Sequence, residues 1–189
     1  MTMHEPELWL IRHGLTEWAR DRRHTGRTDL PLLPEGEEKA AALAPRLAGV
    51  HFDLQLASPL QRAWRTAELA GLDPKAEPDA LEWDYGDYEG ITTAQIQEQV
   101  PGWSIWSSPI PNGESLAQVS ARADAVIARV REQAQTRAVL VAHAHYLRIL
   151  AARWIGQDAS VAAHLALHTS TLSVLAWDRG TPIIDQWNG

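Results

Sequence analysis

Short apolar runs alternate with longer amphipathic stretches along the chain, and this alternation predicts strands and helices in turn. Five runs are short, apolar and bounded by glycine, proline or polar residues, which is typical of buried strands; they cover residues 8–11, 54–57, 138–142, 171–177 and 183–187. Apolar residues spaced three or four apart predict helices, over residues 35–47, 60–70, 116–130 and 146–155. Strands alternating with helices indicate an α/β fold, a three-layer sandwich in which a mostly parallel sheet carries helices on both faces.

Local signals add helix boundaries to this pattern. Two capping boxes, Thr92 with Gln95 and Ser115 with Gln118, predict two helix starts. Ser58 before a proline is expected to cap the 60–70 helix. Proline within 35–47 is expected to break or kink the last turn there. On the helix that begins near residue 116, one apolar stripe packs inward and the arginines are expected to reach water; these are Arg122, Arg129 and Arg131.

Length and composition narrow the class of protein. The 189 residues contain no repeat or linker, so one domain spanning 1–189 is expected. A net charge of -7 argues against binding to nucleic acid or to an anionic membrane. The absence of cysteine excludes a thiolate nucleophile and any zinc site with cysteine ligands. The N-terminus lacks a basic and apolar leader pattern, and no apolar run approaches the length of a membrane span, so we expect a cytoplasmic protein.

The first candidate chemistry follows the first strand, at Arg12, His13 and Gly14. Ligands of parallel sheets bind beyond the carboxyl ends of the strands, which is where both His13 and His143 fall. The guanidinium fork of Arg12 suits phosphate oxygens, and Gly14 permits close backbone approach. A histidine at this position is equally often a structural group. The neighbouring Arg12 and Gly14 favour an anion-binding site beside a nucleophilic histidine.

Three further patterns carry weaker signals. Arg62 lies in the first turn of a predicted helix, where it adds to an anion site or forms a surface ion pair. Glu82 lies among aromatic residues, which suits proton donation, whereas Asp84, Asp87 and Glu89 are equally compatible with solvated loop charges; all four belong to EWDYGDYEG. His143 and His145 are expected on the same side of a strand end, as in a metal pair, but no third ligand follows at a recognisable spacing.

Taken in order, these patterns resemble the histidine phosphatase superfamily, also called phosphoglycerate mutase-like. The matching motifs are LIRHGLTEW with HTGRTDLPL, SPLQRAWRTA, EWDYGDYEG and VAHAHYLRILAARW. The resemblance is strongest to a small phosphatase branch with sedoheptulose-bisphosphatase-like and mycobacterial acid-phosphatase-like members. It implies a phosphoglycerate mutase-like fold and the following residue roles: His13 as nucleophile, Arg12, Arg62 and His143 as phosphate pocket, Glu82 as proton donor, and substrate contacts at Thr25, Gly26 and Ala144.

The residue types agree with these implied roles. Neutral imidazole can attack phosphorus, and the neighbouring charges of Arg12 and Arg62 disfavour protonation of His13. The resulting phosphohistidine is hydrolysed by water activated by Glu82, which first gives its proton to the leaving alkoxide. Because the cationic side chains stabilise the transferred phosphoryl group, we expect no metal and no cofactor. The partner is then a small phosphoester.

The substrate class is inferred from the distribution of cations. No lysine or arginine occurs from residue 76 to residue 121, although a segment at about 91–114, with Trp103 and Trp106, is expected to cover the site as a lid. A mutase must hold a substrate carboxylate, so a lid without cations favours hydrolysis. By contrast, the loop after His13 is rich in arginine, and it either seats a second phosphate or is a solvated basic loop; the candidates for the second phosphate are Arg20, Arg23 and Arg27.

Three rival functions stay open. A phosphoglycerate mutase is the runner-up, but Ala19 stands where mutases commonly carry asparagine. Ala144 replaces a family glycine and is the best support for a phosphoester-binding protein without turnover, which the intact His13 and Glu82 oppose. A metal protein built on the His-x-His pair is the third.

Overall fold

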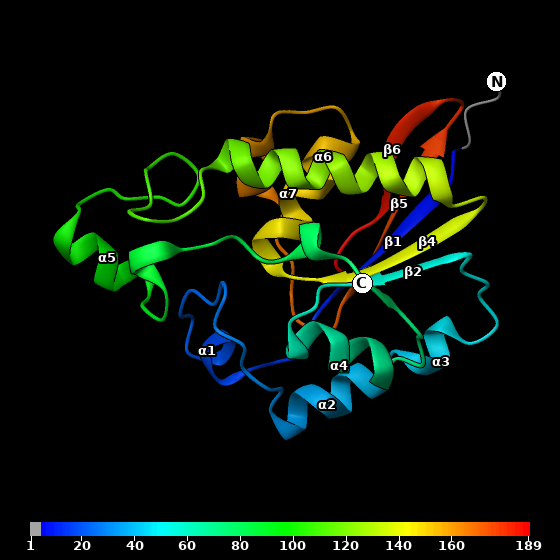
Figure 1. Cartoon of the computed structure of the whole chain (residues 1–189), viewed down its shortest axis with the longest axis horizontal. Helices are drawn as coiled ribbons and strands as arrows, with labels where there is room; N and C mark the ends of the chain where they lie inside the picture. Colours follow the sequence, from blue (N-terminus) through cyan, green and yellow to red (C-terminus); the bar gives the residue numbers. More distant parts are fainter. Residues whose placement is uncertain (1–4) are drawn as a thin grey trace.

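A six-stranded mixed sheet forms the centre of the computed structural model, which describes residues 5–189 (Figure 1). The strand order is β3-β2-β4-β1-β5-β6. The four strands β3, β2, β4 and β1 pair in parallel. Strand β5 pairs antiparallel with β1, and β6 pairs antiparallel with β5. Their bounds are Glu7–Arg12 (β1), Leu54–Ala57 (β2), Lys75–Ala76 (β3), Arg137–Ala142 (β4), Leu172–Asp178 (β5) and Thr181–Gln186 (β6). The predicted α/β class is confirmed, and only the two-residue strand β3 was missed.

Helices cover both faces of this sheet. Helices α6 (Leu116–Gln133) and α7 (Ala144–Trp154) lie on one face, and α2 (Pro34–Ala41), α3 (Ala44–Leu47) and α4 (Gln61–Leu69) lie on the other (Figure 1). Because successive strand residues point to opposite faces, Leu10 packs toward the α6 and α7 side and Ile11 toward the α3 and α4 side. The sheet thereby acquires two separate apolar cores, as expected of a three-layer sandwich.

Smaller elements lie outside these layers. They are α1 (Glu17–Arg20), α5 (Thr93–Gln99) and the 3-10 helices η1 (Pro78–Ala80), η2 (Gly86–Tyr88) and η3 (Ala159–His164). Helix α5 and its neighbouring turns extend to one side of the molecule (Figure 1).

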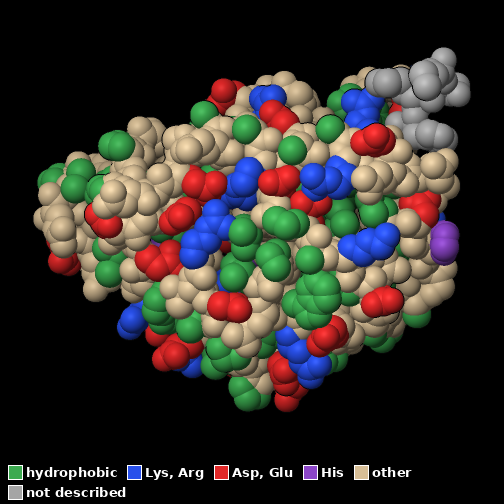
Figure 2. Space-filling model, in the orientation of Figure 1, with side chains coloured by type: hydrophobic (Ala, Val, Ile, Leu, Met, Phe, Trp, Pro, Cys, Tyr) green, Lys and Arg blue, Asp and Glu red, His purple; other side chains and the backbone are tan. Residues whose placement is uncertain are grey.

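Within the part of the chain described, no helix combines the length and apolar character of a membrane span. On the face drawn in Figure 2, basic and acidic side chains are interleaved.

The predicted break in the 35–47 stretch is present, whereas the predicted Ser58 cap of the 60–70 helix is wrong. The 35–47 stretch forms two helices, and Pro45 lies in the first turn of α3. Proline lacks an amide hydrogen and therefore fits the start of a new helix better than the end of an old one. Helix α4 begins after Leu60 without a side-chain cap from Ser58. Asp29 instead accepts a hydrogen bond from the Gln61 amide at 2.8 Å, and Ser58 serves the site described below.

Both predicted capping boxes are present, at Thr92 and Ser115. The arginines of α6, however, do not simply face water. Arg122 is only 16% exposed and is paired with Glu114. Arg129 is paired with Glu77 and Asp79, and the Arg131 guanidinium stacks over the Trp177 ring at 5.0 Å. These contacts join α6 to other segments of the chain.

Candidate active site

A cavity of about 510 Å³ opens beside the carboxyl ends of β1 and β4. It brings together eight of the residues singled out from the sequence, namely Arg12, His13, Arg23, Thr25, Glu82, Trp103, Trp106 and Ala144. Five others do not line it: Gly26, Arg62 and His143 are buried behind it, and Arg20 and Arg27 lie outside it.

His13 directly follows β1 and is tied to β4 by a hydrogen bond from its amide to the Ala142 carbonyl, 3.0 Å long. Its side chain is only 5% exposed. Nδ1 lies 2.7 Å from the Gly14 carbonyl oxygen. A carbonyl only accepts, so Nδ1 carries the proton and Nε2 carries the free lone pair. Burial, reinforced by the charges of Arg62 and Arg12, holds the pKa of His13 well below its usual value, so the ring is neutral near neutral pH.

Gly14 is required by packing rather than by a ligand. A β-carbon at this position would lie 2.7 Å from the Gly36 carbonyl oxygen, which is closer than real contacts allow. The Gly14 amide also donates to the Thr66 hydroxyl of α4 at 2.8 Å. The close approach of α2 therefore fixes the backbone immediately after His13.

Arg62 and His143 form a buried pair beneath His13. Both are fully buried, and Arg62 Nε donates to His143 Nδ1 at 3.2 Å. His143 Nε2 then bonds to the Ser58 hydroxyl at 2.8 Å, and the His13 and His143 rings are 5.2 Å apart. Arg62 also donates to the carbonyls of Thr25, Gly26 and Thr28. Its observed contacts thus join His143 to the 25–28 loop.

Arg12 reaches the cavity wall from the end of β1. One terminal nitrogen donates to the Leu167 carbonyl, whereas Nε is buried with no hydrogen-bond partner among residues 5–189. A buried donor without an acceptor is costly. This one belongs to a residue that lines the cavity directly before His13 in the sequence.

Glu82 is held at the first turn of α7. Oε1 accepts from the amides of Trp83 and Tyr146, both at 2.9 Å, and Oε2 accepts from the His145 amide at 3.1 Å. The carboxyl group therefore occupies the N-terminus of α7, whose orphan amides and dipole stabilise negative charge. Aromatic neighbours alone did not predict this polar environment. Oε2 accepts from one amide and Oε1 from two.

The other acidic residues of this loop are not merely solvated. Glu89 accepts from the amides of Gly26 and Thr28, at 2.9 and 3.1 Å. Asp84 accepts from the Gly86 amide, and Asp87 accepts from the Asn112 side chain. These carboxylates hold the loops around the cavity in place.

His143 and His145 do not face the same side. The chain leaves β4 at residue 142 and enters α7 at Ala144, so strand alternation does not reach His145. His145 Nδ1 instead lies 2.6 Å from the Tyr85 hydroxyl, and burial holds the pKa of Tyr85 well above its usual value. Tyr85 therefore keeps its proton and shares this hydrogen bond with the His145 ring. Among residues 5–189, no group of three histidine, aspartate or glutamate side chains is arranged to hold a metal ion.

The outer wall carries a cation that the sequence analysis missed. Arg148 of α7 lines the cavity, and its guanidinium lies 4.6 Å from the centre of the Trp106 ring. Its Nε and one terminal nitrogen donate to the carbonyls of Ala162 and Ala163. The 91–114 segment itself carries no lysine or arginine, but α7 brings the Arg148 cation against its Trp106 ring. The spacing from Ala144, one helical turn, was the available signal.

The remaining candidates differ in placement. Trp103 is 2% exposed and its ring packs edge-on against His24 and Tyr88, so it supports the wall more than it presents a surface. Arg22, which belongs to the arginine-rich loop after His13, lines the cavity beside Arg23. The two arginines outside are held by acidic partners: Arg20 pairs with Asp21 at 3.2 Å, and Arg27 pairs with Asp84 and Glu114.

The three-layer α/β fold places paired histidines beside two arginines at the carboxyl ends of its parallel strands, an arrangement suited to phosphoester chemistry. The model of the histidine phosphatase superfamily (branch 1) matches residues 8–189, and the chain belongs to that superfamily.

Relatives give the same class. An acid phosphatase of Mycobacterium tuberculosis is 37% identical over 95% of this chain and 91% of its own. A sedoheptulose 1,7-bisphosphatase of Saccharomyces cerevisiae is 33% identical over 80% of this chain and 68% of its own. A solved Mycobacterium tuberculosis structure superimposes with a TM-score of 0.92, at 34% identity over 97% of each chain. The chain is a phosphatase of this superfamily, with the predicted phosphoglycerate mutase-like fold.

Proposed function

We propose that this protein is a metal-independent phosphomonoesterase for small organic phosphates, favouring a sugar phosphate or bisphosphate, and that it works through a phosphohistidine at His13. The observation that carries the proposal is the tautomer of His13. Its Nδ1 is committed to the Gly14 carbonyl, and its low pKa leaves an unprotonated Nε2 at the cavity. An unprotonated ring nitrogen is what nucleophilic attack requires.

In the first step, Nε2 of His13 bonds to phosphorus while the bond from phosphorus to the ester oxygen breaks. Glu82, protonated at Oε2, gives its proton to the departing oxygen, so the alcohol leaves and Glu82 becomes a carboxylate. The amides at the start of α7 stabilise that carboxylate.

In the second step, a water molecule attacks the phosphohistidine. The oxygen of the water bonds to phosphorus while Glu82 takes a proton from that water, and the bond from phosphorus to the His13 nitrogen breaks. Inorganic phosphate leaves and both side chains regain their starting states. Arg12 supplies positive charge at the cavity wall, and Arg62 supplies it from beneath His13.

The preference for a doubly charged substrate rests on the outer wall. Arg22, Arg23 and Arg148 all line the same cavity as His13. A second phosphate would meet one or more of these guanidinium groups while the reacting phosphate lies at His13, so binding of the remote group would contribute to catalysis. The relative named sedoheptulose 1,7-bisphosphatase supports this choice. In this proposal the 91–114 segment, which supplies Trp103 and Trp106, acts as the lid of a single domain.

Phosphate release from sugar phosphates, sugar bisphosphates, nucleotides and an aryl phosphate tests the proposed activity. We expect turnover in the presence of a chelator, inhibition by vanadate and rapid acid-sensitive labelling of His13 by a phosphorylated substrate. Restoration of a chelator-sensitive rate by zinc or magnesium would contradict metal independence. Net transfer of phosphate to phosphoglycerate would favour the mutase, and tight binding without release would favour a binding protein.

Single alanine variants test the substrate class. Arg23→Ala and Arg148→Ala are expected to lower kcat/KM for a bisphosphate about 10-fold more than for its monophosphate, as loss of a charged hydrogen bond implies. Arg20→Ala and Arg27→Ala are matched controls, because both side chains lie outside the cavity lining. If all four variants treat the two substrates alike, the enzyme has broad specificity for monophosphates instead.

A further inference from the structure

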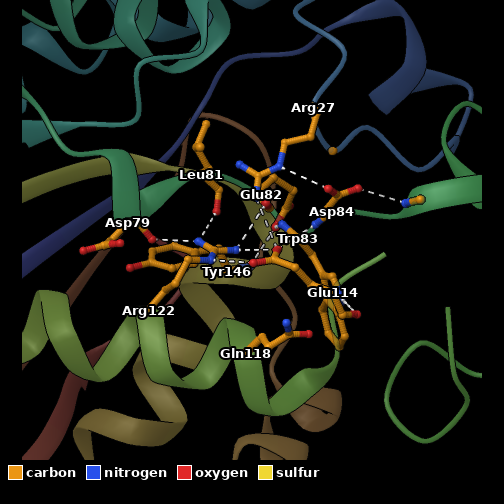
Figure 3. Close-up of polar contacts among 12 residues, drawn as sticks. Arg27, Asp79, Leu81, Glu82, Trp83, Asp84, Glu114, Gln118, Arg122 and Tyr146 are labelled. Carbon is orange, nitrogen blue, oxygen red and sulfur yellow. Dashed lines mark hydrogen bonds and ion pairs between the residues drawn. The ribbon is translucent and has the colours of Figure 1, made fainter. Parts of the chain in front are cut away.

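A network of polar contacts lies behind Glu82, on the side of α6, and joins segments far apart in the sequence (Figure 3). Its centre is Arg122 of α6, which forms a two-pronged ion pair with Glu114, with both N to O distances at 2.8 Å. The pair is mostly buried, with each side chain 16% exposed. An ion pair of this kind does not add much stability by itself, because desolvation offsets its attraction. Its contacts to the backbone indicate another role.

Arg122 donates hydrogen bonds to the backbone carbonyls of the segment that ends at Glu82. One terminal nitrogen donates to the carbonyls of Asp79 and Leu81, at 2.7 and 2.8 Å. The other approaches the Glu82 carbonyl at 3.4 Å (Figure 3). A guanidinium group has several donors in one rigid plane, so it can hold these carbonyls and Glu114 together. The ammonium group of lysine cannot reproduce that fork.

Glu114 holds the backbone that leaves Glu82. Its Oε2 accepts from the Asp84 amide at 2.9 Å, its own amide donates to the Asp84 carbonyl at 3.0 Å, and its carbonyl accepts from the Trp83 indole at 2.8 Å (Figure 3). Burial alone raises the pKa of Glu114, but the hydrogen bonds from Arg122 and the Asp84 amide outweigh it and lower the pKa, so Glu114 stays ionised. Arg122 and Glu114 therefore hold the backbone or side chain of the residues on both sides of Glu82 in the sequence.

The network also touches the helix that receives the Glu82 carboxyl. The Arg122 guanidinium lies 5.3 Å from the centre of the Tyr146 ring, and the Tyr146 amide is one of the donors to Glu82. The same arginine thus contacts the loop that carries the carboxyl group and the helix that accepts it. A shift of Arg122 would change the fit between the two.

We propose that Arg122 and Glu114 are positioning residues that hold the Glu82 carboxyl in register with α7 for proton transfer. Neither residue lines the cavity with His13, so neither contacts the substrate, and both act through Glu82. This inference rests on the proposed phosphatase mechanism, in which Glu82 protonates the leaving group. Proton transfer depends steeply on geometry, so a small displacement of Glu82 is expected to slow the reaction without abolishing it.

The test compares Arg122→Lys and Glu114→Gln with Arg153→Lys, the matched control. Arg153 also forms an ion pair to α6, with Asp124 at 2.9 Å, but that pair contacts none of residues 79–84. We expect both test variants to lower kcat about 10-fold for an alkyl phosphate and less than about 3-fold for 4-nitrophenyl phosphate, whose leaving group needs no proton. KM and the control variant should change little.

A double-mutant cycle with Glu82→Gln separates positioning from general support of the fold. If Arg122 acts through Glu82, Arg122→Lys should lower kcat less than about 2-fold further in the Glu82→Gln background. Full additivity, or equal losses for alkyl and aryl phosphates, would overturn the inference. Should Arg122→Lys fail to fold, the Glu114→Gln cycle decides by the same criteria.

The proposed function can fail separately from this inference. Failure of the mechanism would appear in variants of the reacting residues themselves, as turnover that survives His13→Ala or as a Glu82→Gln variant without dependence on the leaving group. Failure of the positioning role alone would leave both of those results intact while the Arg122 and Glu114 variants lose their selective effect on alkyl phosphates.

Discussion

The inner and outer parts of the candidate site are built on different principles. The inner part, at the ends of β1 and β4, consists of His13 with Arg62 and His143, all at most 5% exposed and bonded to one another or to nearby backbone. The outer part presents aromatic rings and arginines, among them Trp106 beneath Arg148 and the exposed Arg23.

Burial explains how the two parts differ. Desolvation is the largest influence on the histidines of the inner part, and it holds the pKa values of His13 and His143 well below their usual value. At the outer wall, Arg23 is exposed and Arg148 is partly exposed, so their charges contribute an attraction that water partly screens. The inner part is suited to chemistry on one phosphoryl group, and the outer part is suited to substrate selection.

The largest effect is expected from removing the inner nucleophile. His13→Ala should lower phosphate release about 10⁴-fold or more, as loss of a covalent nucleophile does in other enzymes. The fold should persist because the ring contributes little apolar area. Initial rates and acid-sensitive labelling measure the loss, and circular dichroism checks the fold. Turnover near the wild-type rate would remove the covalent mechanism.

The next effect concerns Glu82, which joins the inner part to α7. Glu82→Gln should lower kcat about 10²-fold for alkyl phosphates, within the range of general acid catalysis, and less for aryl phosphates. A series of substrates with graded leaving-group pKa values measures the difference. Equal losses across the series would show that Glu82 is not the proton donor.

Acid should destabilise the folded protein through its buried histidines. His13, His143 and His145 all have pKa values well below 6.5 in the folded state. As the pH falls below about 6.5, the unfolded chain binds protons that the folded chain does not, so the free energy of unfolding falls by up to about 1.4 kcal/mol per pH unit for each histidine.

Urea denaturation at a series of pH values from 7.5 to 5 measures this slope. The loss continues until the pH reaches the folded-state pKa values and is absent above the usual histidine range. His13→Ala should have a shallower slope than the wild type. A free energy of unfolding independent of pH in this range would contradict the buried, neutral assignment.

The smallest expected effect is at Ala144, where the two parts meet. Ala144→Gly removes a methyl group from the cavity wall and should lower KM by about 3-fold, within the modest range expected for one methyl group. Because residue 144 begins α7, the free energy of unfolding should fall by about 0.5–1 kcal/mol. Steady-state kinetics and thermal denaturation measure the two changes. An unchanged or higher KM would show that the methyl group does not crowd the substrate.

The sequence by itself determined the alternation of strands and helices, both capping boxes and the position of His13 at the end of a central strand. These features depend on residues within a few positions of one another. Apolar spacing fixes which face of an element is buried, and a cap is made within one helical turn. Local patterns were therefore sufficient for the fold class and for the nucleophile candidate.

Only the tertiary structure decided the partners across long separations. Ser58 contacts His143 rather than capping its own helix, and Arg148 stands against Trp106 from another element. Arg20 and Arg27 are near His13 in sequence yet lie outside the cavity, because acidic side chains hold them elsewhere. Charges and hydrogen bonds act through space, and the hydrogen-bonded Arg12 and Leu167 are 155 positions apart in the sequence. Sequence spacing contains no measure of that distance.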